Sequence, residues 1–133
     1  MPNYKTVFFT LGMLQIILGI FMIIPIIIQY VYGEFDSSFI IASIITLIFG
    51  ILFVISNLDY DKKINLHQAF LLTSLSWITI AIFGALPIFF SKLNLSFTDA
   101  FFESMSGITT TGSTIIINLE NAPKSILLWR ALL

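Results

Sequence analysis

The chain has 133 residues, of which 58 % are hydrophobic and 10 % are charged, and its formal net charge is −1. Soluble domains are about 45–50 % apolar and about 25 % charged, so this composition excludes an ordinary soluble domain and indicates an integral membrane protein. No basic surface favours nucleic acid as a partner, and the absence of cysteine excludes disulfides, thiolate metal sites and a cysteine nucleophile.

The charged residues divide the chain into long apolar stretches. Stretches without Lys, Arg, Asp or Glu cover residues 6–33, 37–58 and 64–91. Each is longer than the roughly 20 residues that a helix needs to cross about 30 Å of hydrocarbon. The first is also too long for the apolar core of a secretory signal, about 7–15 residues, so we expect it to be retained. The sequence predicts membrane-spanning helices near 7–31, 38–57 and 68–90.

The lysines predict the orientation of these helices. Lys5 precedes the first span, and Lys62 and Lys63 lie between the second and the third. The loop between the first two spans holds Glu34 and Asp36 and no cation. Because cytoplasmic loops carry an excess of Lys and Arg, we expect the N-terminus to be cytoplasmic and the third span to run outward.

A shorter helix follows the third span. Ser96 and Asp99 have the spacing of a capping box, and Gly107 suits the left-handed residue that ends many helices. The helix predicted over 97–106 would be about 15 Å long, or half of a bilayer. Since the preceding span ends outside, we expect this helix to enter the membrane from outside.

Residues 108–117 are too short for another span, and the run TTTGST within them is a poor helix former. Irregular backbone at membrane depth persists only where it is buried in protein or lines a water-filled path. A polar stretch from Asn118 to Lys124 then returns to the outside, and an apolar helix begins at Ser125. The pattern predicts a span, a re-entrant half-helix, an extended polar return and a second span.

The chemistry of this return favours cations. The C-terminus of the half-helix carries about half a negative charge, and successive carbonyls of an extended loop can replace the water around an ion. Gly112 can adopt the dihedrals that such a loop needs, and neutral oxygens suit a hard monovalent cation. Alternatives are an ordinary outer loop and the edge of a soluble β-hairpin. A phosphate-binding loop is weaker, because the glycine-lysine-serine/threonine ending is missing.

The run FGALPIFF…LSFTDAFFESMSGITTTGSTII…NAPKSILLWRALL, within residues 64–133, resembles the first pore repeat of the Trk/Ktr/HKT superfamily. It is most similar to the TrkH-type membrane subunit of bacterial potassium uptake systems. The resemblance implies an all-α membrane protein with an N-terminal two-helix transmembrane hairpin (1–63). The first span–pore-helix–span repeat (64–133) follows, with a filter loop at 108–114 and a truncated second span.

The resemblance also implies site residues. The backbone carbonyls of Thr109, Thr110, Thr111 and Gly112 would form one filter strand, with K⁺ held at Thr110 and Thr111, and Gly112 would favour potassium over sodium. Asp99, Glu103 and Arg130 would support the filter. An arginine in lipid is costly and should face protein or the interface, so we hypothesise that Arg130 pairs with Asp99 or Glu103.

The expected function is that of a potassium uptake transporter subunit in the cell inner (plasma) membrane, present here as an N-terminal fragment. Potassium is the transported ion, and no cofactor is expected. The family implies a homodimer in the lipid bilayer and a cytosolic nucleotide-binding regulatory subunit. The alternative is a non-conducting membrane scaffold or regulatory partner derived from such a transporter. An enzyme is not expected, because no base and nucleophile are arranged together.

Overall fold

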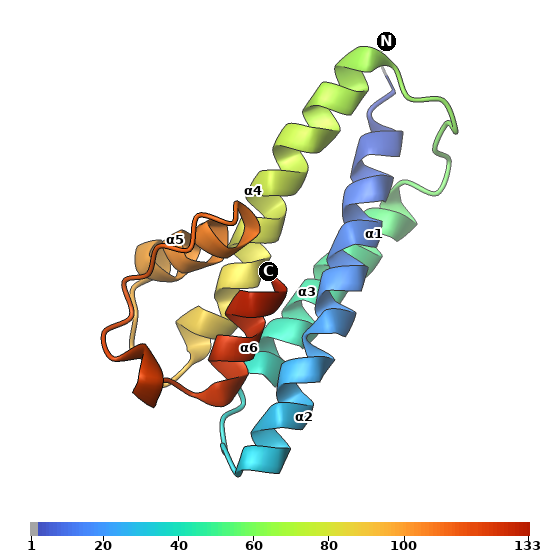
Figure 1. Cartoon of the computed structure of the whole chain (residues 1–133). Coiled ribbons are helices and arrows are strands. Elements are labelled where there is room, and N and C mark those ends of the chain that lie inside the picture. The colour runs from blue at the N-terminus through green and yellow to red at the C-terminus, as the bar shows by residue number, and fades with distance from the viewer. Residues whose placement is uncertain (1–2) are drawn as a thin grey trace.

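The computed structural model describes residues 3–133, which form helices joined by loops. Two long antiparallel helices, α1 and α3, run beside a third, α4; the short helix α5 packs on α4, and α6 packs between α2 and α5 (Figure 1). In chain order the elements are α1 (Lys5–Phe21), α2 (Ile23–Tyr32), α3 (Ser38–Ser56), α4 (Leu66–Phe90), α5 (Phe97–Ile108), the 3₁₀ turn η1 (Leu119–Asn121) and α6 (Lys124–Leu132).

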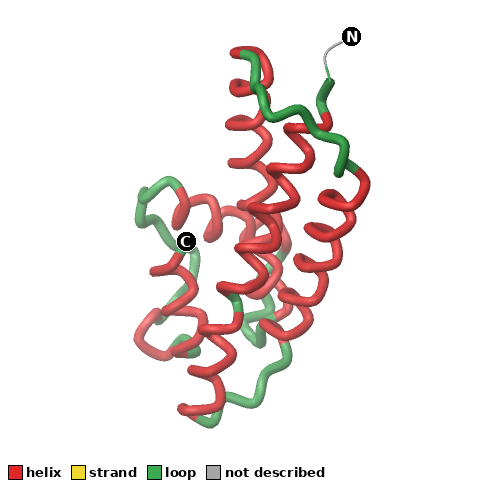
Figure 2. The backbone as a smooth tube through the Cα atoms, turned by 90° about the vertical axis from the view of Figure 1, so that its right-hand side faces the viewer, coloured by secondary structure: helices red, strands yellow, loops and turns green. Residues whose placement is uncertain are grey.

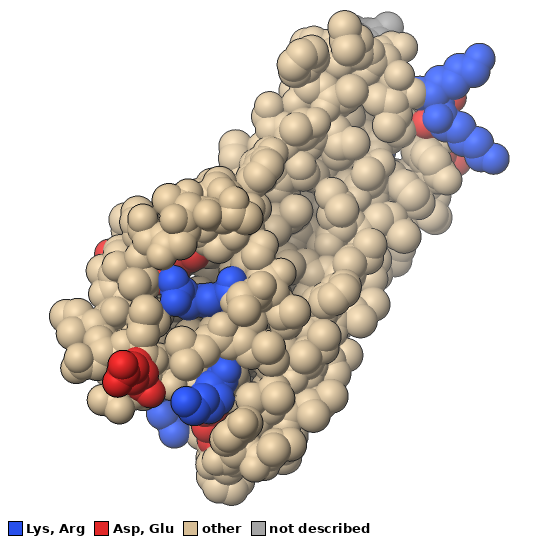
Figure 3. All heavy atoms as spheres, in the orientation of Figure 1, with Lys and Arg blue, Asp and Glu red and all other residues tan. Residues whose placement is uncertain are grey.

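The three predicted spans are confirmed as long apolar helices. The segments able to cross a membrane by length and composition are Lys5–Tyr32, Ser38–Ser56 and Leu66–Phe90. On the face drawn in Figure 3, Lys and Arg gather near the two ends of the molecule, and a broad band without charge covers the long helices. This distribution is that of a multi-span membrane protein.

The first span is interrupted at Met22, between α1 and α2. Pro25 follows shortly after, within α2. Proline has no amide hydrogen, and its ring collides with the carbonyl of the residue four positions earlier, which here is Phe21, the last residue of α1. The interruption is therefore the expected effect of Pro25.

The N-terminal end of α1 and the loop between α3 and α4 lie together at one end of the molecule (Figure 1). Thr6 donates a hydrogen bond from its side chain to the carbonyl of Asp61 at 2.8 Å, and Gln68 donates from its side chain to the carbonyl of Asn3 at 2.7 Å. The chain start and this loop thus lie on the same side of the membrane, as the lysine distribution predicted.

Helices α1 and α3 pack closely through two glycines. A Cβ atom added to Gly12 would lie 2.8 Å from the carbonyl oxygen of Gly50, and one added to Gly50 would lie 2.9 Å from the backbone nitrogen of Ile16. Side chains cannot fit at either position, so the backbones touch directly. This is the small-residue packing that lets helices associate in a membrane.

The core joins the N-terminal hairpin to the C-terminal helix. Met22 and Phe39 of the hairpin and Trp129 of α6 are buried in one cluster. The rings of Phe39 and Trp129 meet edge to face, with their centroids 5.9 Å apart. The segments 1–63 and 64–133 are thus packed against each other as one body.

The short re-entrant helix differs from the expectation at its end. Ser96 caps its start as predicted, accepting a hydrogen bond from the backbone nitrogen of Asp99 at 3.2 Å. However, α5 continues to Ile108 and not to Ser106, so the prediction that Gly107 ends the helix was wrong. Gly107 packs against α6 instead, where an added Cβ would lie 3.1 Å from that of Leu133.

Candidate functional site

The site is built around the end of α5, which reaches the C-terminal half of α4. Ser104 of α5 faces Gly84, where an added Cβ would lie 2.7 Å from the Ser104 hydroxyl. Trp129 of α6 donates its indole hydrogen to the carbonyl of Gly84 at 2.9 Å. Gly84 lies six residues before the end of α4 at Phe90, or about 9 Å along the helix axis. The three helices therefore meet within Leu66–Phe90, a segment long and apolar enough to cross a membrane.

Figure 1 shows how α5 is placed. The helix points from the side of the molecule towards the middle of α4, and the following segment returns beside it before α6 begins. The tube view in Figure 2 shows the same return as a loop without regular secondary structure. The predicted sequence of half-helix, irregular return and second helix is thus present in the fold.

A buried carboxylate holds this return in place. Glu103 of α5 is fully buried. Its Oε1 atom accepts hydrogen bonds from the Thr114 hydroxyl at 2.7 Å, from the backbone nitrogen of Ile115 and from that of Ile116 at 3.4 Å. An ionised carboxylate accepts several such bonds, and bonds to a charged acceptor are stronger than neutral ones. Glu103 therefore fixes three consecutive residues of the returning chain against α5.

The same carboxylate pairs with α6. The Nε atom of Arg130 lies 2.8 Å from Oε2 of Glu103, and the Arg130 side chain is 17 % exposed. The contact has the distance of an ion pair without the direction of a good hydrogen bond. Breaking a buried pair leaves an uncompensated charge, which costs about 3–5 kcal/mol. Of the two partners predicted for Arg130, the structure selects Glu103; Asp99 lies in the first turn of α5 and makes no ion pair within residues 3–133.

A compact turn joins α5 to the return. The backbone nitrogen of Thr111 donates to the carbonyl of Ser106 at 3.0 Å. The Ser106 hydroxyl donates to the carbonyl of Ser113 at 2.7 Å. Thr110 and Gly112 both adopt left-handed backbone, with φ of 56° and 74°. Such a conformation costs a residue other than glycine about 1–2 kcal/mol, so the strain at Thr110 must be held by its surroundings, whereas Gly112 adopts it freely.

The backbone oxygens of this turn are unusual. Across the described residues 3–133, no hydrogen bond is accepted by the carbonyls of the four consecutive residues Thr109, Thr110, Thr111 and Gly112. The carbonyl of Ile108, directly before this run, also accepts none within the described residues, whereas those of Gly107 and Ser113 each accept one. Backbone carbonyls without a protein partner normally face water or a ligand. The four oxygens that the sequence singled out are therefore among the carbonyls of residues 108–112, which have no protein partner in the described part of the chain.

The turn is open on one side. Residues 109–115 are exposed, although they follow a helix whose inner face is buried. A hollow of about 320 Å³ lies beside them, lined by Ser106, Gly107, Thr110, Gly112, Leu127, Arg130 and Ala131. An added Cβ at Gly112 would meet nothing within 4 Å. The exposed turn and Arg130 of the charged pair thus border the same hollow.

Sequence reasoning missed several residues that hold the site. Thr114 and Ser106 hold the turn through their hydroxyls, and Glu34 lies far from the pore helix in the sequence but binds the start of α6. The excess of hydroxyl residues around Gly112 was a usable signal for the first two. No group of three or more His, Asp and Glu able to hold a metal ion occurs within the described part of the chain.

A family model and two related sequences all connect this chain with cation transport proteins. The family model of TrkH, described as a cation transport protein, matches residues 35–133. The chain is 40 % identical over 121 residues to an uncharacterized cation transporter of Methanocaldococcus jannaschii, covering 90 % of this chain and 25 % of that protein. It is 39 % identical over 124 residues to the Trk system potassium uptake protein TrkI of Halomonas elongata, covering 92 % and 25 %.

A solved structure agrees as well. The crystal structure of the potassium transporter TrkH from Vibrio parahaemolyticus matches with a TM-score of 0.91 and 30 % sequence identity, covering 97 % of this chain and 28 % of that one. The chain thus spans about a quarter of the length of its relatives. These relatives are described as transporters and not as enzymes, as the sequence led us to expect. The match over residues 35–133, together with the shared fold, shows that the chain belongs to the TrkH family of cation transport proteins.

Proposed function

We propose that this chain is part of the membrane subunit of a potassium uptake transporter, and that the turn after α5 is one strand of its selectivity filter. In this proposal the carbonyl oxygens of Thr109, Thr110, Thr111 and Gly112 replace water around K⁺, most closely at Thr110 and Thr111. The observation that carries it is that these four consecutive residues are exposed beside an open hollow and that their carbonyls have no hydrogen-bond donor within residues 3–133. Rings of such oxygens are the usual means of selecting K⁺.

The surroundings support this role. The C-terminus of α5 directs the negative end of its dipole towards the turn. Glu103 and Arg130 hold the turn from behind and cancel each other's charge. One strand supplies only part of a coordination shell, so further strands must come from other segments or other copies. Relatives named as potassium uptake proteins span about four times this length, which gives room for such segments.

The proposal includes the setting of the protein. It lies in the cell inner membrane with its N-terminus in the cytoplasm, which agrees with Lys5, Lys62 and Lys63 near one end of the molecule. It acts as a homodimer and is regulated by a cytosolic nucleotide-binding subunit, as the family resemblance implies. Asp99 lies at the outer start of α5, where its carboxylate supports the helix dipole and attracts cations.

The proposal is tested by replacing Gly112 with serine in the full-length protein that carries this segment. The variant should lower the preference for K⁺ over Na⁺, measured as ion uptake and as growth rescue of an uptake-deficient cell at low potassium. Gly33→Ser is the control for protein amount, because Gly33 is also left-handed, with φ of 67° and nothing within 4 Å of an added Cβ.

Unchanged rescue and unchanged ion preference in Gly112→Ser would reject the filter assignment. If the full-length protein itself carried no ion, the alternative of a non-conducting scaffold or regulatory partner would be preferred.

A further inference from the structure

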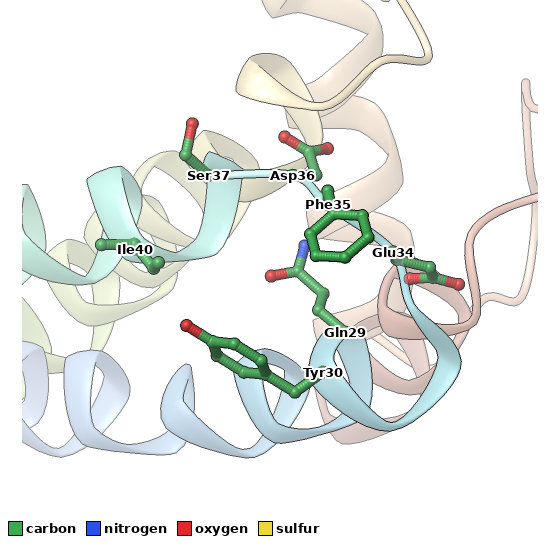
Figure 4. A pocket seen from close by; sticks show the side chains of 7 residues that line it. All are labelled: Gln29, Tyr30, Glu34, Phe35, Asp36, Ser37 and Ile40. Carbon is green, nitrogen blue, oxygen red and sulfur yellow. The ribbon is translucent and has the colours of Figure 1, made fainter.

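The loop between α2 and α3 binds the start of α6. Oε1 of Glu34 accepts a hydrogen bond from the backbone nitrogen of Lys124 at 2.5 Å. Its Oε2 accepts from Ser125 twice, from the hydroxyl at 2.8 Å and from the backbone nitrogen at 3.3 Å. In Figure 4 the Glu34 carboxylate points away from the hollow around Gln29 and Ile40, towards the reddish ribbon of α6. The carboxylate therefore belongs to α6 and not to that hollow.

This contact provides hydrogen-bond acceptors for the first turn of α6, which has no cap of its own. The first turn of a helix has backbone hydrogens without partners and carries partial positive charge. The residue at the N-cap position of α6 is Pro123, which makes no side-chain hydrogen bond to the helix. Glu34, about 90 residues earlier in the chain, supplies both an acceptor and a negative charge. It is the cap of α6, contributed by the N-terminal hairpin.

Other contacts hold the same loop on the C-terminal segment. The Lys92 ammonium, in the loop after α4, donates a hydrogen bond to the carbonyl of Phe35 at 3.0 Å. Beneath the loop, Phe39 packs edge to face on Trp129. The loop is thus attached both before α5 and at the start of α6, so it brackets the helices on either side of the turn.

The cap is linked to the turn through α6. Arg130 follows Ser125 on α6 by five residues, and it pairs with Glu103. Glu103 in turn holds Thr114 and the two backbone nitrogens that follow it. A shift at the start of α6 therefore displaces Arg130, and a displaced Arg130 changes how Glu103 holds the turn.

We infer that Glu34 is a positioning residue: by capping α6 from the N-terminal hairpin, it sets the geometry of the turn at residues 109–112. The inference rests on the proposed function, because it assigns to the hairpin an effect on ion selectivity. In this inference the N-terminal hairpin helps to position the filter turn, in addition to anchoring the protein in the membrane.

The test uses Glu34→Gln in the full-length protein, which keeps the size of the side chain and removes its charge. Glu120→Gln is the matched control, because Glu120 is exposed near the same loop and makes no side-chain hydrogen bond within residues 3–133. Uptake of K⁺ and Na⁺ per protein molecule should show a K⁺ preference lowered about three- to ten-fold in Glu34→Gln, the scale of a lost helix cap. Glu120→Gln should leave it unchanged.

A role limited to folding predicts a different result. Glu34→Gln would then lower the amount or thermal stability of the protein and leave the ion preference of the remaining molecules unchanged, and this outcome would overturn the inference. If Glu34→Gln does not accumulate, Ser125→Ala removes a single hydroxyl from the same contact. It should lower the K⁺ preference about two-fold, the scale of one weak hydrogen bond, and an unchanged preference would again reject the inference.

Coupling between Glu34 and Ser125, which share the contact at the start of α6, provides the second arm. If the cap acts through α6, Ser125→Ala combined with Glu34→Gln should lower the preference no further than Glu34→Gln alone, because both remove one contact. Full additivity would overturn the inference. Gly112→Ser is measured in parallel: if it leaves ion preference unchanged, the filter proposal fails. If Gly112→Ser alters the preference and Glu34→Gln does not, only the role of Glu34 is rejected.

Discussion

Oε2 of Glu103 and Nε of Arg130 lie 2.8 Å apart, between the re-entrant helix α5 and the C-terminal helix α6. The other oxygen of the same carboxylate holds Thr114 and the backbone that follows it. One side chain thus joins two helices and the return from the turn. Loss of either Arg130 or the Thr114 hydroxyl should therefore lower the stability of the full-length protein that carries this segment.

Replacing Arg130 with glutamine should destabilise the protein strongly. The variant leaves the fully buried Glu103 carboxylate without its cation, and removing one partner of a buried pair costs about 3–5 kcal/mol. The thermal unfolding midpoint in detergent should fall, and K⁺ uptake should fall with it. Arg130→Lys should retain part of both, because it keeps the charge and loses the planar guanidinium. Wild-type stability and uptake in Arg130→Gln would contradict the assigned role of the pair.

Replacing Asp59 with asparagine should have no measurable effect on the unfolding midpoint. Asp59 lies 3.9 Å from Lys5, but its side chain is 94 % exposed, and ion pairs in water contribute little. Asp59→Asn breaks an exposed ion pair, and Arg130→Gln breaks a buried one, so the two variants compare the two kinds of pair. A clear loss of stability would mean that the ends of the first span and of the loop after α3 are held more by charge than the structure indicates.

Replacing Thr114 with valine should cost about 1.5–3 kcal/mol, the net value of a hydrogen bond to a charged group. The change keeps the shape of the side chain and removes the hydroxyl that binds Glu103 at 2.7 Å. Thr73→Val is the control, since the Thr73 hydroxyl binds only the carbonyl of Ala69 on an exposed part of α4. Equal effects of the two variants on the unfolding midpoint would argue against a special contribution of Thr114.

Replacing Gly84 with alanine should destabilise the contact between α4 and α5. The added Cβ would lie 2.7 Å from the Ser104 hydroxyl and 3.1 Å from a methyl carbon of Leu133, and overpacking of this kind costs about 1–3 kcal/mol. Adding Ser104→Ala removes the closest atom and should recover part of the loss in the unfolding midpoint. If the double variant unfolds at the same midpoint as Gly84→Ala alone, the contact with the Ser104 hydroxyl is not the cause of the destabilisation.

The sequence predicted the spans well because hydropathy decides them. Long runs without charge can be stable only inside the bilayer, and the observed helices follow those runs within a few residues. The start of α5 was also predictable, since a serine cap acts through residues that are close in sequence. Its end was not. Gly107 could have ended the helix on local grounds, but its lack of a side chain is used for contact with Leu133.

Contacts between distant parts of the chain could not be predicted. The pairing of Arg130 with a carboxylate could be predicted, because an unpaired charge in lipid is costly. The sequence left two candidate partners on α5, Asp99 and Glu103. The choice of Glu103 over Asp99 depends on which face of α5 meets α6, which is a property of packing. The pairing of Glu34 with the start of α6 spans most of the chain, and no local pattern indicates it.

The pairing of Glu103 with Arg130 also bears on the valence of the ion. The attraction of a carboxylate doubles for a divalent cation, so a lone buried carboxylate behind the turn would hold calcium firmly and obstruct the passage of smaller charges. Arg130 brings the formal charge of the pair to zero, and the nearby oxygens of residues 109–112 are neutral dipoles. If residues 109–112 form the proposed filter strand, calcium would therefore gain little there to offset the loss of its tightly held water, and a singly charged ion would meet no such obstacle.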